Sequence, residues 1–307
     1  MNFSYQKMVE LASSGLQAAG IGEKVAYETA QFLALAELDG LASHGLARVS
    51  QYAGHAKNGR IELSPKIKVR PFKTSAALVD ACDGLAFPAL RFATDLSVNI
   101  ASKTGVGLVA VANSHHFGVA GHFAEAAARA GYISLLFGNT PAAMPMVGGS
   151  KALFGTNPLA AAFPIAKRDP LVIDMSLSAV ARGKLLVAAK KGESIPEGWA
   201  LTAQGKPTTN PNEGLKGLMV PLGGDKGALL ALIVELLVVG LSGSRFSYEA
   251  DSFFDAKGNR PRIGQLLLTI DPGLAGGQVF ASKMQEFLKA LASDSGTRVP
   301  GQRRFKQ

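Results

Sequence analysis

The chain has 307 residues, with 32 Lys and Arg against 23 Asp and Glu, and it contains one cysteine. A chain of this length forms one large or two medium domains and can bury enough apolar surface to fold without disulfides or bound metal. The lone Cys82 excludes an internal disulfide, and a hydrophobic content of 47% excludes a disordered chain. The net charge of +9 indicates either a charged surface that favours solubility or an anionic partner, namely nucleic acid, a membrane surface or a small ligand.

Neither a targeting segment nor a membrane span is expected. The first ten residues lack the basic and apolar regions of a signal peptide. The longest apolar run, 228–241, contains Glu235 and is shorter than the roughly 20 residues that a membrane helix needs. We therefore expect a buried helix there and a cytoplasmic protein.

The first sixty residues predict helices, because apolar residues recur at helical spacing from position 9 to position 36. Gly20 and Gly22 separate the first two helices, and Ser43 is a candidate N-cap for a third helix that includes Arg48 and Tyr52.

From about residue 61, short apolar strands alternate with helical stretches. We expect strands at 76–80, 106–111, 132–137, 171–174 and 265–271, and helices at 88–103, 121–130, 176–190 and 282–293. The segment 195–218 is rich in Pro and Gly and predicts a loop, and a glycine-rich turn at 223–227 opens the apolar helix. This alternation predicts an α/β fold.

Several familiar motifs are absent from the sequence. The nearest approach to G-x-G-x-x-G is Gly105-Val106-Gly107, which precedes a strand and lacks the third glycine, so a Rossmann fingerprint is not supported. There is no P-loop, no paired-cysteine spacing and no H-E-x-x-H, so no metal site is expected. The basic residues are dispersed and aromatic residues make up only 7%, which argues against nucleic acid as the partner.

The first group of residues that could carry chemistry is Ser43, His44 and Arg48. On a helix starting at Ser43, His44 and Arg48 would lie four residues apart on one face. A positive helix end would lower the pKa of His44, and the guanidinium of Arg48 matches a carboxylate. A proton donor beside a carboxylate clamp suits reduction of a keto or imino acid. The alternative is a capped surface helix.

The second group follows the strand that ends at Val111. It contains Asn113, Ser114, His115 and His116. In an open α/β sheet, ligands bind at the carboxyl ends of strands, so one of the two histidines could act as an acid or base. Adjacent side chains point in different directions, so we expect at most one to face a ligand. Loop or capping histidines are the alternative.

Three weaker signals remain. Asp174-Met175-Ser176 stands where a strand leads into a helix, and Asp225-Lys226 follows two glycines at a helix start that could present backbone amides to an anion. The segment 298–304 contains a Pro-Gly turn, and its arginines could bind a phosphate. Capping, a plain helix start and a basic tail are the respective alternatives.

Taken together and in this order, the motifs resemble the malate/L-lactate dehydrogenase family of NAD(P)-dependent oxidoreductases, which lack a Rossmann fold. The matching segments are Ser43-His44-Gly45, Asn113-Ser114-His115-His116-Phe117-Gly118, Gly155-Thr156-Asn157-Pro158, Ala181-Arg182-Gly183-Lys184, Pro196-Glu197-Gly198-Trp199-Ala200, Pro207-Thr208-Thr209, Gly223-Gly224-Asp225-Lys226-Gly227 and Pro300-Gly301-Gln302-Arg303-Arg304. The resemblance runs from the first helix to the C-terminus.

The resemblance implies a non-Rossmann open α/β nucleotide-binding region at 61–279, a helical N-terminal part at 1–60 with the segment 280–307 packing near it, and a homodimer. Within the family, the sequence looks most similar to the cyclic-imine reductases, which reduce Δ1-pyrroline-2-carboxylate and Δ1-piperideine-2-carboxylate with NADPH. The alternatives are an NAD(P)-dependent 2-hydroxy acid dehydrogenase and, on the net charge alone, a non-catalytic anion-binding protein; NADH remains possible as cofactor. Either substrate is a small anionic carboxylate.

The resemblance also implies roles for individual residues. The expected catalytic residues are His44 with Ser43, or alternatively His116; the expected substrate contacts are Arg48, Thr156, Arg182, Gly183 and Lys184. The expected cofactor contacts are Asn113, Ser114, His115, His116, Phe117, Asp174, Met175, Ser176, Asp225, Lys226, Arg298, Pro300, Gly301, Gln302, Arg303 and Arg304. Lys184 departs from the pattern of the imine reductases. Some of the imine reductases that this chain resembles have an acidic residue at this position, and that residue orients the catalytic histidine.

Overall fold

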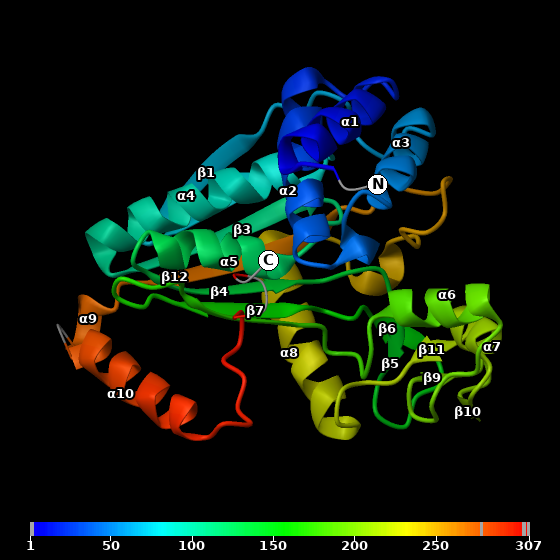
Figure 1. Ribbon diagram of the computed structural model, residues 1–307. Coiled ribbons are helices and arrows are strands. Elements are labelled where there is room, and N and C mark those ends of the chain that lie inside the picture. Colours follow the sequence, from blue (N-terminus) through cyan, green and yellow to red (C-terminus); the bar gives the residue numbers. More distant parts are fainter. Residues whose placement is uncertain (1–2, 277–278, 303–304, 306–307) are drawn as a thin grey trace.

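The computed structural model describes residues 3–276, 279–302 and 305 (Figure 1). Its helices are α1 (Tyr5–Gln17), α2 (Glu23–Leu38), α3 (Arg48–Lys57), α4 (Ala86–Thr104), α5 (Ala120–Arg129), α6 (Arg182–Lys191), α7 (Pro211–Lys216), α8 (Asp225–Ser242), α9 (Gly273–Gly276) and α10 (Val279–Ser293), with two 3-10 turns, η1 (Ala42–His44) and η2 (Ser247–Glu249). Its strands are β1 (Lys68–Lys73), β2 (Ala76–Asp80), β3 (Val106–Ser114), β4 (Ile133–Gly138), β5 (Met144–Pro145), β6 (Ala152–Phe154), β7 (Leu159–Phe163), β8 (Leu171–Met175), β9 (Ala200–Leu201), β10 (Pro207–Thr208), β11 (Leu218–Met219) and β12 (Ile263–Ile270).

The main sheet has the strand order β1-β2-β3-β12-β4-β7-β8 and is open at both ends. Only β2 and β3 run parallel, and every other neighbouring pair is antiparallel. A Rossmann sheet is parallel and built from repeated crossover units, so this topology is of another kind. The expected non-Rossmann α/β fold is confirmed.

Helices cover both faces of this sheet. On one face α4 packs on β3 and β12, α5 packs on β4 and β7, and α2 packs on α4; on the other face α8 packs on β12, β3 and β4 (Figure 1). Successive side chains of a strand point to opposite faces of the sheet, so each strand contributes to two cores. In β3, Val109 and Val111 face the α4 side, whereas Leu108 and Ala110 face the α8 side. The sheet therefore divides the molecule into two hydrophobic layers.

Local signals explain several of the helix ends. The Ser4 hydroxyl caps α1 by accepting from the Lys7 amide at 3.2 Å, and Asn210 with Pro211 opens α7. Gly105 ends α4 with φ +80°, a conformation that a residue with a Cβ rarely adopts. Most of the expected strands and helices are found within a few residues of their predicted bounds.

Four local predictions are wrong. Ser43 is not the N-cap of a helix, because it lies in the 3-10 turn η1 and α3 begins only at Arg48. The helix expected from 176 begins at Arg182. The strand from 106 continues to Ser114, since Ile263 of β12 pairs with that residue. The expected loop at 195–218 contains α7 and a small sheet of β9, β10 and β11, whose short strands carry little sequence pattern.

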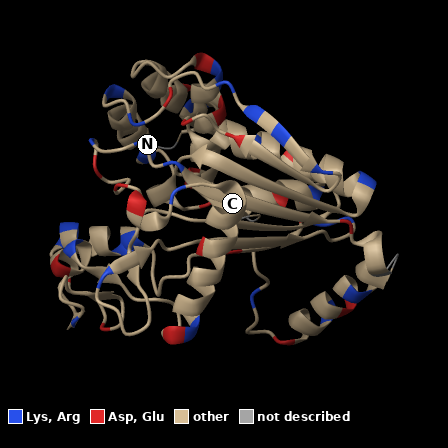
Figure 2. Ribbon diagram, turned by 180° about the vertical axis from the view of Figure 1, so that it is seen from behind, with Lys and Arg blue, Asp and Glu red and all other residues tan. Residues whose placement is uncertain are grey.

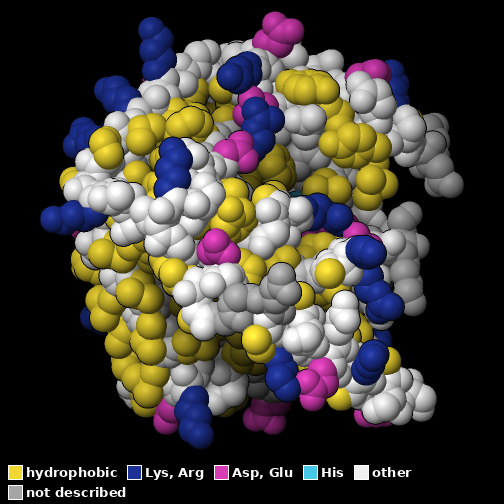
Figure 3. Space-filling model, turned by 90° about the vertical axis from the view of Figure 1, so that its left-hand side faces the viewer, with side chains coloured by type: hydrophobic (Ala, Val, Ile, Leu, Met, Phe, Trp, Pro, Cys, Tyr) yellow, Lys and Arg dark blue, Asp and Glu magenta, His cyan; other side chains and the backbone are white. Residues whose placement is uncertain are grey.

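The apolar helix α8 is also less buried than expected. One side packs on the sheet through residues such as Ala231, Val234 and Val238, but Ile233 and Leu236 are more than half exposed. Hydrophobic side chains gather on the surface at the lower left of the face in Figure 3. Within the described residues, no helix is long and apolar enough to cross a membrane.

The C-terminal segment divides in two. Helix α10 lies far from α1–α3, packs on α9 and buries none of its described side chains (Figure 1). The tail then returns to the sheet, where Gly301 approaches Val172 of β8 and Arg129 of α5 lies 5.3 Å from the ring centre of Phe305. Helix α10 thus lies apart from α1–α3, and the division of the chain at residue 60, with 280–307 packing near the N-terminal part, stays a prediction.

Candidate active site

A cavity of about 460 Å³ lies where η1, the start of α3, the loop before α5 and the ends of β7 and β8 meet. Ligand pockets usually have volumes between about 300 and 1,000 Å³. The cavity collects twelve of the residues predicted from sequence: Ser43, His44, Arg48, His116, Phe117, Thr156, Asp174, Met175, Ser176, Arg182, Gly183 and Gly301. Residues from six separate segments of the chain therefore form one site.

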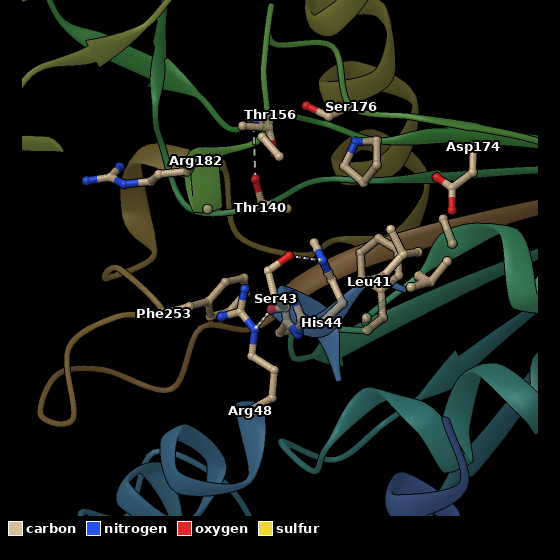
Figure 4. Close-up of a pocket in the computed structure, with 18 of the residues that line it drawn as sticks. Leu41, Ser43, His44, Arg48, Thr140, Thr156, Asp174, Ser176, Arg182 and Phe253 are labelled. Carbon is tan, nitrogen blue, oxygen red and sulfur yellow. Dashed lines mark hydrogen bonds between the residues drawn. The ribbon is translucent and has the colours of Figure 1, made fainter. Parts of the chain in front are cut away.

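Figure 4 shows how the cavity is divided. Ser43, Arg48 and Phe253 lie together at one side, Asp174 lies at the opposite side, and Thr140 and Thr156 form part of the wall between Arg182 and Ser176. The two arginines and the acidic Asp174 thus mark opposite ends of one cavity. We refer to these as the arginine end and the Asp174 end.

Arg48 reaches the cavity by a route other than the predicted one. His44 and Arg48 do not share a helix; instead the Arg48 Nε donates to the Ser43 backbone oxygen at 2.7 Å, which turns the guanidinium back toward η1. The Ser43 hydroxyl contacts His44 Nδ1 at 3.0 Å. Burial, with smaller contributions from Arg48 and His122, lowers the pKa of His44 to about 4. A helix end is not the cause, and His44 is neutral at pH 7.

His116 stands beside His44 in the cavity, with ring centres 5.7 Å apart. The buried hydroxyl of Tyr52, on α3, contacts His116 Nδ1 at 2.6 Å. This contact occupies Nδ1 and leaves Nε2 as the nitrogen that can exchange a proton with a ligand. Burial and then Arg48 hold the pKa of His116 well below its ordinary value, so this imidazole is also neutral at pH 7.

His115 points elsewhere, as expected for neighbouring side chains. Its Nε2 lies 3.0 Å from Nδ1 of His55 on α3, and it does not line the cavity. Asn113 donates to the Asp80 carboxylate at 3.0 Å, and Ser114 is buried in β3. The motif from 113 to 118 therefore contributes two of the predicted residues, His116 and Phe117, together with Gly118, while Asn113, Ser114 and His115 lie outside the cavity wall.

Arg48 and Arg182 converge on one aromatic ring. Their guanidinium carbons lie 5.4 and 5.5 Å from the ring centre of Phe254, and all three residues line the cavity. Arg182 also donates to the Leu215 backbone oxygen at 2.6 Å. Burial lowers the pKa of both arginines, but a guanidinium stays charged at neutral pH. The arginine end can therefore hold anionic groups.

Asp174 caps a helix, but not the one expected from sequence. Its carboxylate accepts from the backbone amide of Gly121 at 2.7 Å, in the first turn of α5, whereas the helix expected to follow it begins later. Its neighbours in the cavity include Val119 and Ala120, where α5 begins. The Asp174 end thus combines a carboxylate with a helix N-terminus.

The remaining predicted residues lie elsewhere or cannot be placed. Lys184 stands over the ring of Trp199, with its Nζ 5.4 Å from the ring centre, so the structure gives it no contact with the cavity. Asn113, Ser114, His115, Asp225, Lys226, Arg298, Pro300 and Gln302 are also absent from the cavity wall. Arg303 and Arg304 lie outside the described residues. Within the described part of the chain, no group of three or more His, Cys, Asp or Glu could hold a metal ion.

Sequence reasoning missed several residues of the wall. Phe253 and Phe254 come from an irregular segment that follows η2, and Asp39 pairs with His122 at 2.7 Å. The sequence did contain a signal for Phe253 and Phe254, because two adjacent aromatic residues stand out in a stretch otherwise rich in Asp, Ser, Lys and Gly. Asp39 carried no such signal, because a single acidic residue at a helix end is common.

The residues at the Asp174 end fit a nicotinamide dinucleotide. The Asp174 carboxylate, which already accepts from the Gly121 amide, can also accept from a ligand hydroxyl or amide, and the start of α5 lines the cavity beside it. Gly301 has φ +86° and lies so close to β8 that an added Cβ would meet the Val172 nitrogen at 3.2 Å. This glycine lets the tail close that end of the cavity.

The fold and the cavity define an α/β enzyme with an open, largely antiparallel sheet and a site that joins two imidazoles to two guanidiniums. Comparison with known proteins identifies its family. A family model described as malate/L-lactate dehydrogenase matches residues 3–307, and the chain belongs to this family of NAD(P)-dependent oxidoreductases. The resemblance drawn from the sequence motifs is confirmed.

Individual relatives differ in activity. The chain is 45% identical to a (2R)-3-sulfolactate dehydrogenase (NADP(+)) of Chromohalobacter salexigens over 302 residues, which are 98% of this chain and 90% of that protein. It is 36% identical to a Δ1-pyrroline-2-carboxylate/Δ1-piperideine-2-carboxylate reductase of Pseudomonas putida, covering 99% of this chain and 89% of that protein. The crystal structure of the Δ1-piperideine-2-carboxylate reductase of Pseudomonas syringae superposes with a TM-score of 0.94 at 35% identity, covering 99% of this chain and 92% of that one.

Proposed function

We propose that this protein is an NADP(H)-dependent dehydrogenase of a 2-hydroxy acid that carries a second anionic group. The observation that carries the proposal is the pair Arg48 and Arg182, which lie against the same Phe254 ring in one cavity. Two guanidiniums match two anionic groups, a carboxylate and a sulfonate or second carboxylate. A cyclic imino acid offers only one.

The relatives support this choice. The sulfolactate dehydrogenase of Chromohalobacter salexigens is more similar in sequence, at 45%, than the imine reductase of Pseudomonas putida, at 36%. The name of the former states NADP(+) as its cofactor. The sequence motifs favoured the imine reductases, and the comparisons favour the alternative, the hydroxy acid dehydrogenases.

In this proposal Arg48 binds the carboxylate next to the reacting carbon, and Arg182 binds the second anion. Bound NADP(H) supplies or accepts the hydride at that carbon. His116 exchanges the proton of the hydroxyl group through Nε2, since Tyr52 occupies Nδ1. Its low pKa keeps the imidazole neutral before substrate binds, so it can act as a base toward the alcohol, and two bound anions would favour its protonated form. His44 is the alternative proton donor.

The histidine roles can be separated by substitution. We expect His116→Ala to lower kcat for keto-acid reduction by about 10²–10⁴-fold, the range that a positioned acid or base contributes. We expect a smaller loss for His44→Ala, whose ring lies beside that of His116 and contacts Ser43. The reverse order of losses would assign the proton to His44.

A cyclic-imine reductase is the second candidate, and the TM-score of 0.94 to the piperideine-2-carboxylate reductase favours it. The deciding experiment follows the absorbance of reduced nicotinamide with sulfopyruvate, oxaloacetate, pyruvate and Δ1-piperideine-2-carboxylate in parallel, with NADPH and then NADH. We expect the highest kcat/KM for one of the two dianions, with NADPH. Faster turnover of the cyclic imine would reject the proposal.

Arg182 gives a sharper test of the second anion site. Arg182→Gln should lower kcat/KM for the dianionic keto acids by at least about tenfold while changing that for pyruvate little, because only the former has a group for this guanidinium. Arg182→Lys is the matched control that keeps the charge and should retain part of the preference. An equal loss for all keto acids would show that Arg182 acts on the fold rather than on selectivity.

We also propose that the subunit forms a homodimer through α8. Leu229, Ile233, Leu236 and Leu241 leave an uncharged apolar stripe along this helix, with each side chain about half exposed. Large exposed apolar patches are typical of protein interfaces. Light scattering should give twice the subunit mass of 31.9 kDa, and Ile233→Glu should halve it. A wild-type monomer would contradict the proposal.

A further inference from the structure

Arg60 is the largest side chain that the described structure buries completely, and it does not line the cavity. None of the ion pairs found among residues 3–276, 279–302 and 305 includes it, although Asp251 and Asp255 lie near enough to favour its charge. Burying a guanidinium is costly unless its donors are satisfied. Arg60 meets this requirement through backbone oxygens.

These oxygens belong to one segment, the 251–259 loop. The Arg60 Nε donates to the Asn259 oxygen at 2.9 Å, Nη1 donates to the oxygens of Ser252, at 3.0 Å, and Asp255, and Nη2 donates to that of Asp251 at 3.2 Å. Most of the loop lacks regular structure, so few backbone contacts of its own fix its shape. Arg60 thus donates to backbone oxygens near both ends of the 251–259 loop.

A neighbour on α3 supports the same arrangement. His55 Nε2 lies 3.0 Å from the Asp255 oxygen and 3.3 Å from Arg60 Nη1. Gln51, on the same helix, donates to the Phe253 oxygen at 2.7 Å. The helix that carries Arg48 into the cavity therefore also contacts the loop that faces it.

The loop carries two rings, Phe253 and Phe254, that contact functional side chains of the cavity. Phe253 packs edge-on against His116, with ring centres 5.3 Å apart. Phe254, which is 46% exposed, lies against both Arg48 and Arg182. A shift of this loop would therefore change the positions of His116, Arg48 and Arg182 relative to one another.

The geometry points to Arg60 as a positioning residue: from outside the cavity, its guanidinium holds the 251–259 loop so that Phe253 and Phe254 set the spacing of His116, Arg48 and Arg182. The planar fork presents five donors at fixed angles, which a lysine cannot reproduce. This inference rests on the proposed function only for its kinetic test, because the loop contacts exist whatever the substrate is.

The kinetic test compares Arg60→Lys and Arg60→Met with wild type in steady-state reduction of the best dianionic keto acid. We expect KM for the keto acid to rise at least about tenfold, while KM for NADPH stays within twofold, because the tethered rings lie at the arginine end. A role in stability alone would lower the melting temperature and leave the KM of the folded enzyme unchanged, and that result would overturn the inference.

Arg260→Lys is the matched control. Arg260 lies next to the loop and bonds to the Gly59 oxygen and the Asp83 carboxylate, but it does not donate to any loop oxygen that Arg60 holds. Its substitution should leave both KM values within twofold of wild type. An equal rise of KM for this control would show that any disturbance of the region suffices, which would also overturn the inference.

Two further measurements keep the inference testable if the enzyme is inactive or a variant fails to fold. In the cofactor-free proteins, Arg60→Lys should speed amide hydrogen exchange in 251–259 at least about tenfold and leave α1 unchanged; exchange as slow as in wild type would overturn the inference. Phe254→Ala, at a partly exposed position, should reproduce the rise of substrate KM. Inactivity of wild type toward every substrate would reject the proposed function and leave the exchange result to decide this inference.

Discussion

At the scale of single residues, the site depends on contacts between side chains far apart in sequence. Tyr52 and His116 are separated by 64 positions, yet the tyrosine hydroxyl fixes Nδ1 of the imidazole at 2.6 Å. A hydroxyl can both donate and accept, so this contact persists whether the imidazole is neutral or protonated. Burial raises the pKa of Tyr52, which therefore stays a hydroxyl at working pH.

We predict that Tyr52→Phe lowers kcat/KM for the keto acid by about 10–100-fold, because the ring of His116 loses the contact that orients it, a part of what a positioned acid contributes. KM for NADPH should change little. Steady-state kinetics with both substrates measures this, and Tyr27→Phe, at an exposed position on α2, serves as a control for loss of a tyrosine hydroxyl. Unchanged kcat/KM would mean that Tyr52 only fills the core.

At the scale of elements, α8 supports the cavity from behind through one buried carboxylate. Glu235 accepts from the Ser247 amide and hydroxyl, each at 2.7 Å, and from the Asn157 side chain at 2.8 Å. Asn157 adjoins Thr156 in the cavity wall and has φ +33°, unusual for a residue with a side chain. The helix thereby links η2 to the turn before β7.

We predict that Glu235→Gln lowers the free energy of unfolding by about 2–3 kcal/mol, because the amide group replaces an acceptor with a donor that faces other donors. Chemical denaturation measures this change. Glu286→Gln on α10, where the carboxylate is exposed, is the matched substitution and should stay within about 0.5 kcal/mol of wild type. Equal effects of the two substitutions would contradict the role given to Glu235.

At the scale of the whole molecule, positive charge is spread over the surface, and few charged side chains reach the site. Figure 2 shows Lys and Arg on many separate elements. The edge strand β1 carries Lys68, Arg70 and Lys73, all exposed, and charged edge strands resist pairing with other chains. The net charge of +9 therefore indicates a charged surface more than a ligand, and the Lys and Arg side chains that line the cavity are Arg48 and Arg182.

Four of the five histidines, His44, His55, His115 and His116, have lowered pKa values, and this makes the stability of the fold depend on pH. Burial is the main cause that lowers the pKa of His44 and His55 to about 4 and holds those of His115 and His116 well below normal. Unfolded histidines titrate near 6.5, so between about pH 6.5 and 4 the unfolded chain binds more protons than the folded one. Stability is therefore fully present above about pH 6.5 and falls as the pH drops through this window.

We predict that the melting temperature decreases by about 10 °C between pH 7 and pH 5, because each of the four histidines loses about 2 kcal/mol of its contribution to stability. Calorimetry in buffers of equal ionic strength measures this. His55→Gln, which removes one of the titrating groups, should make the decrease smaller. A melting temperature that is constant or rises toward pH 5 would contradict the buried, neutral state of these histidines.

The sequence alone determined the fold class, the family and most of the strands and helices, because hydrophobic periodicity and short ordered motifs are local properties of the chain. It also supplied twelve residues of the cavity wall. It could not place Phe253, Phe254 or Arg60, whose roles depend on contacts across about 190 or more positions. Nor could it separate His116 from His115, because which ring faces the cavity follows from how β3 pairs with β12 and how α3 packs beside it. Such contacts form only when distant segments meet, so the tertiary structure decided them.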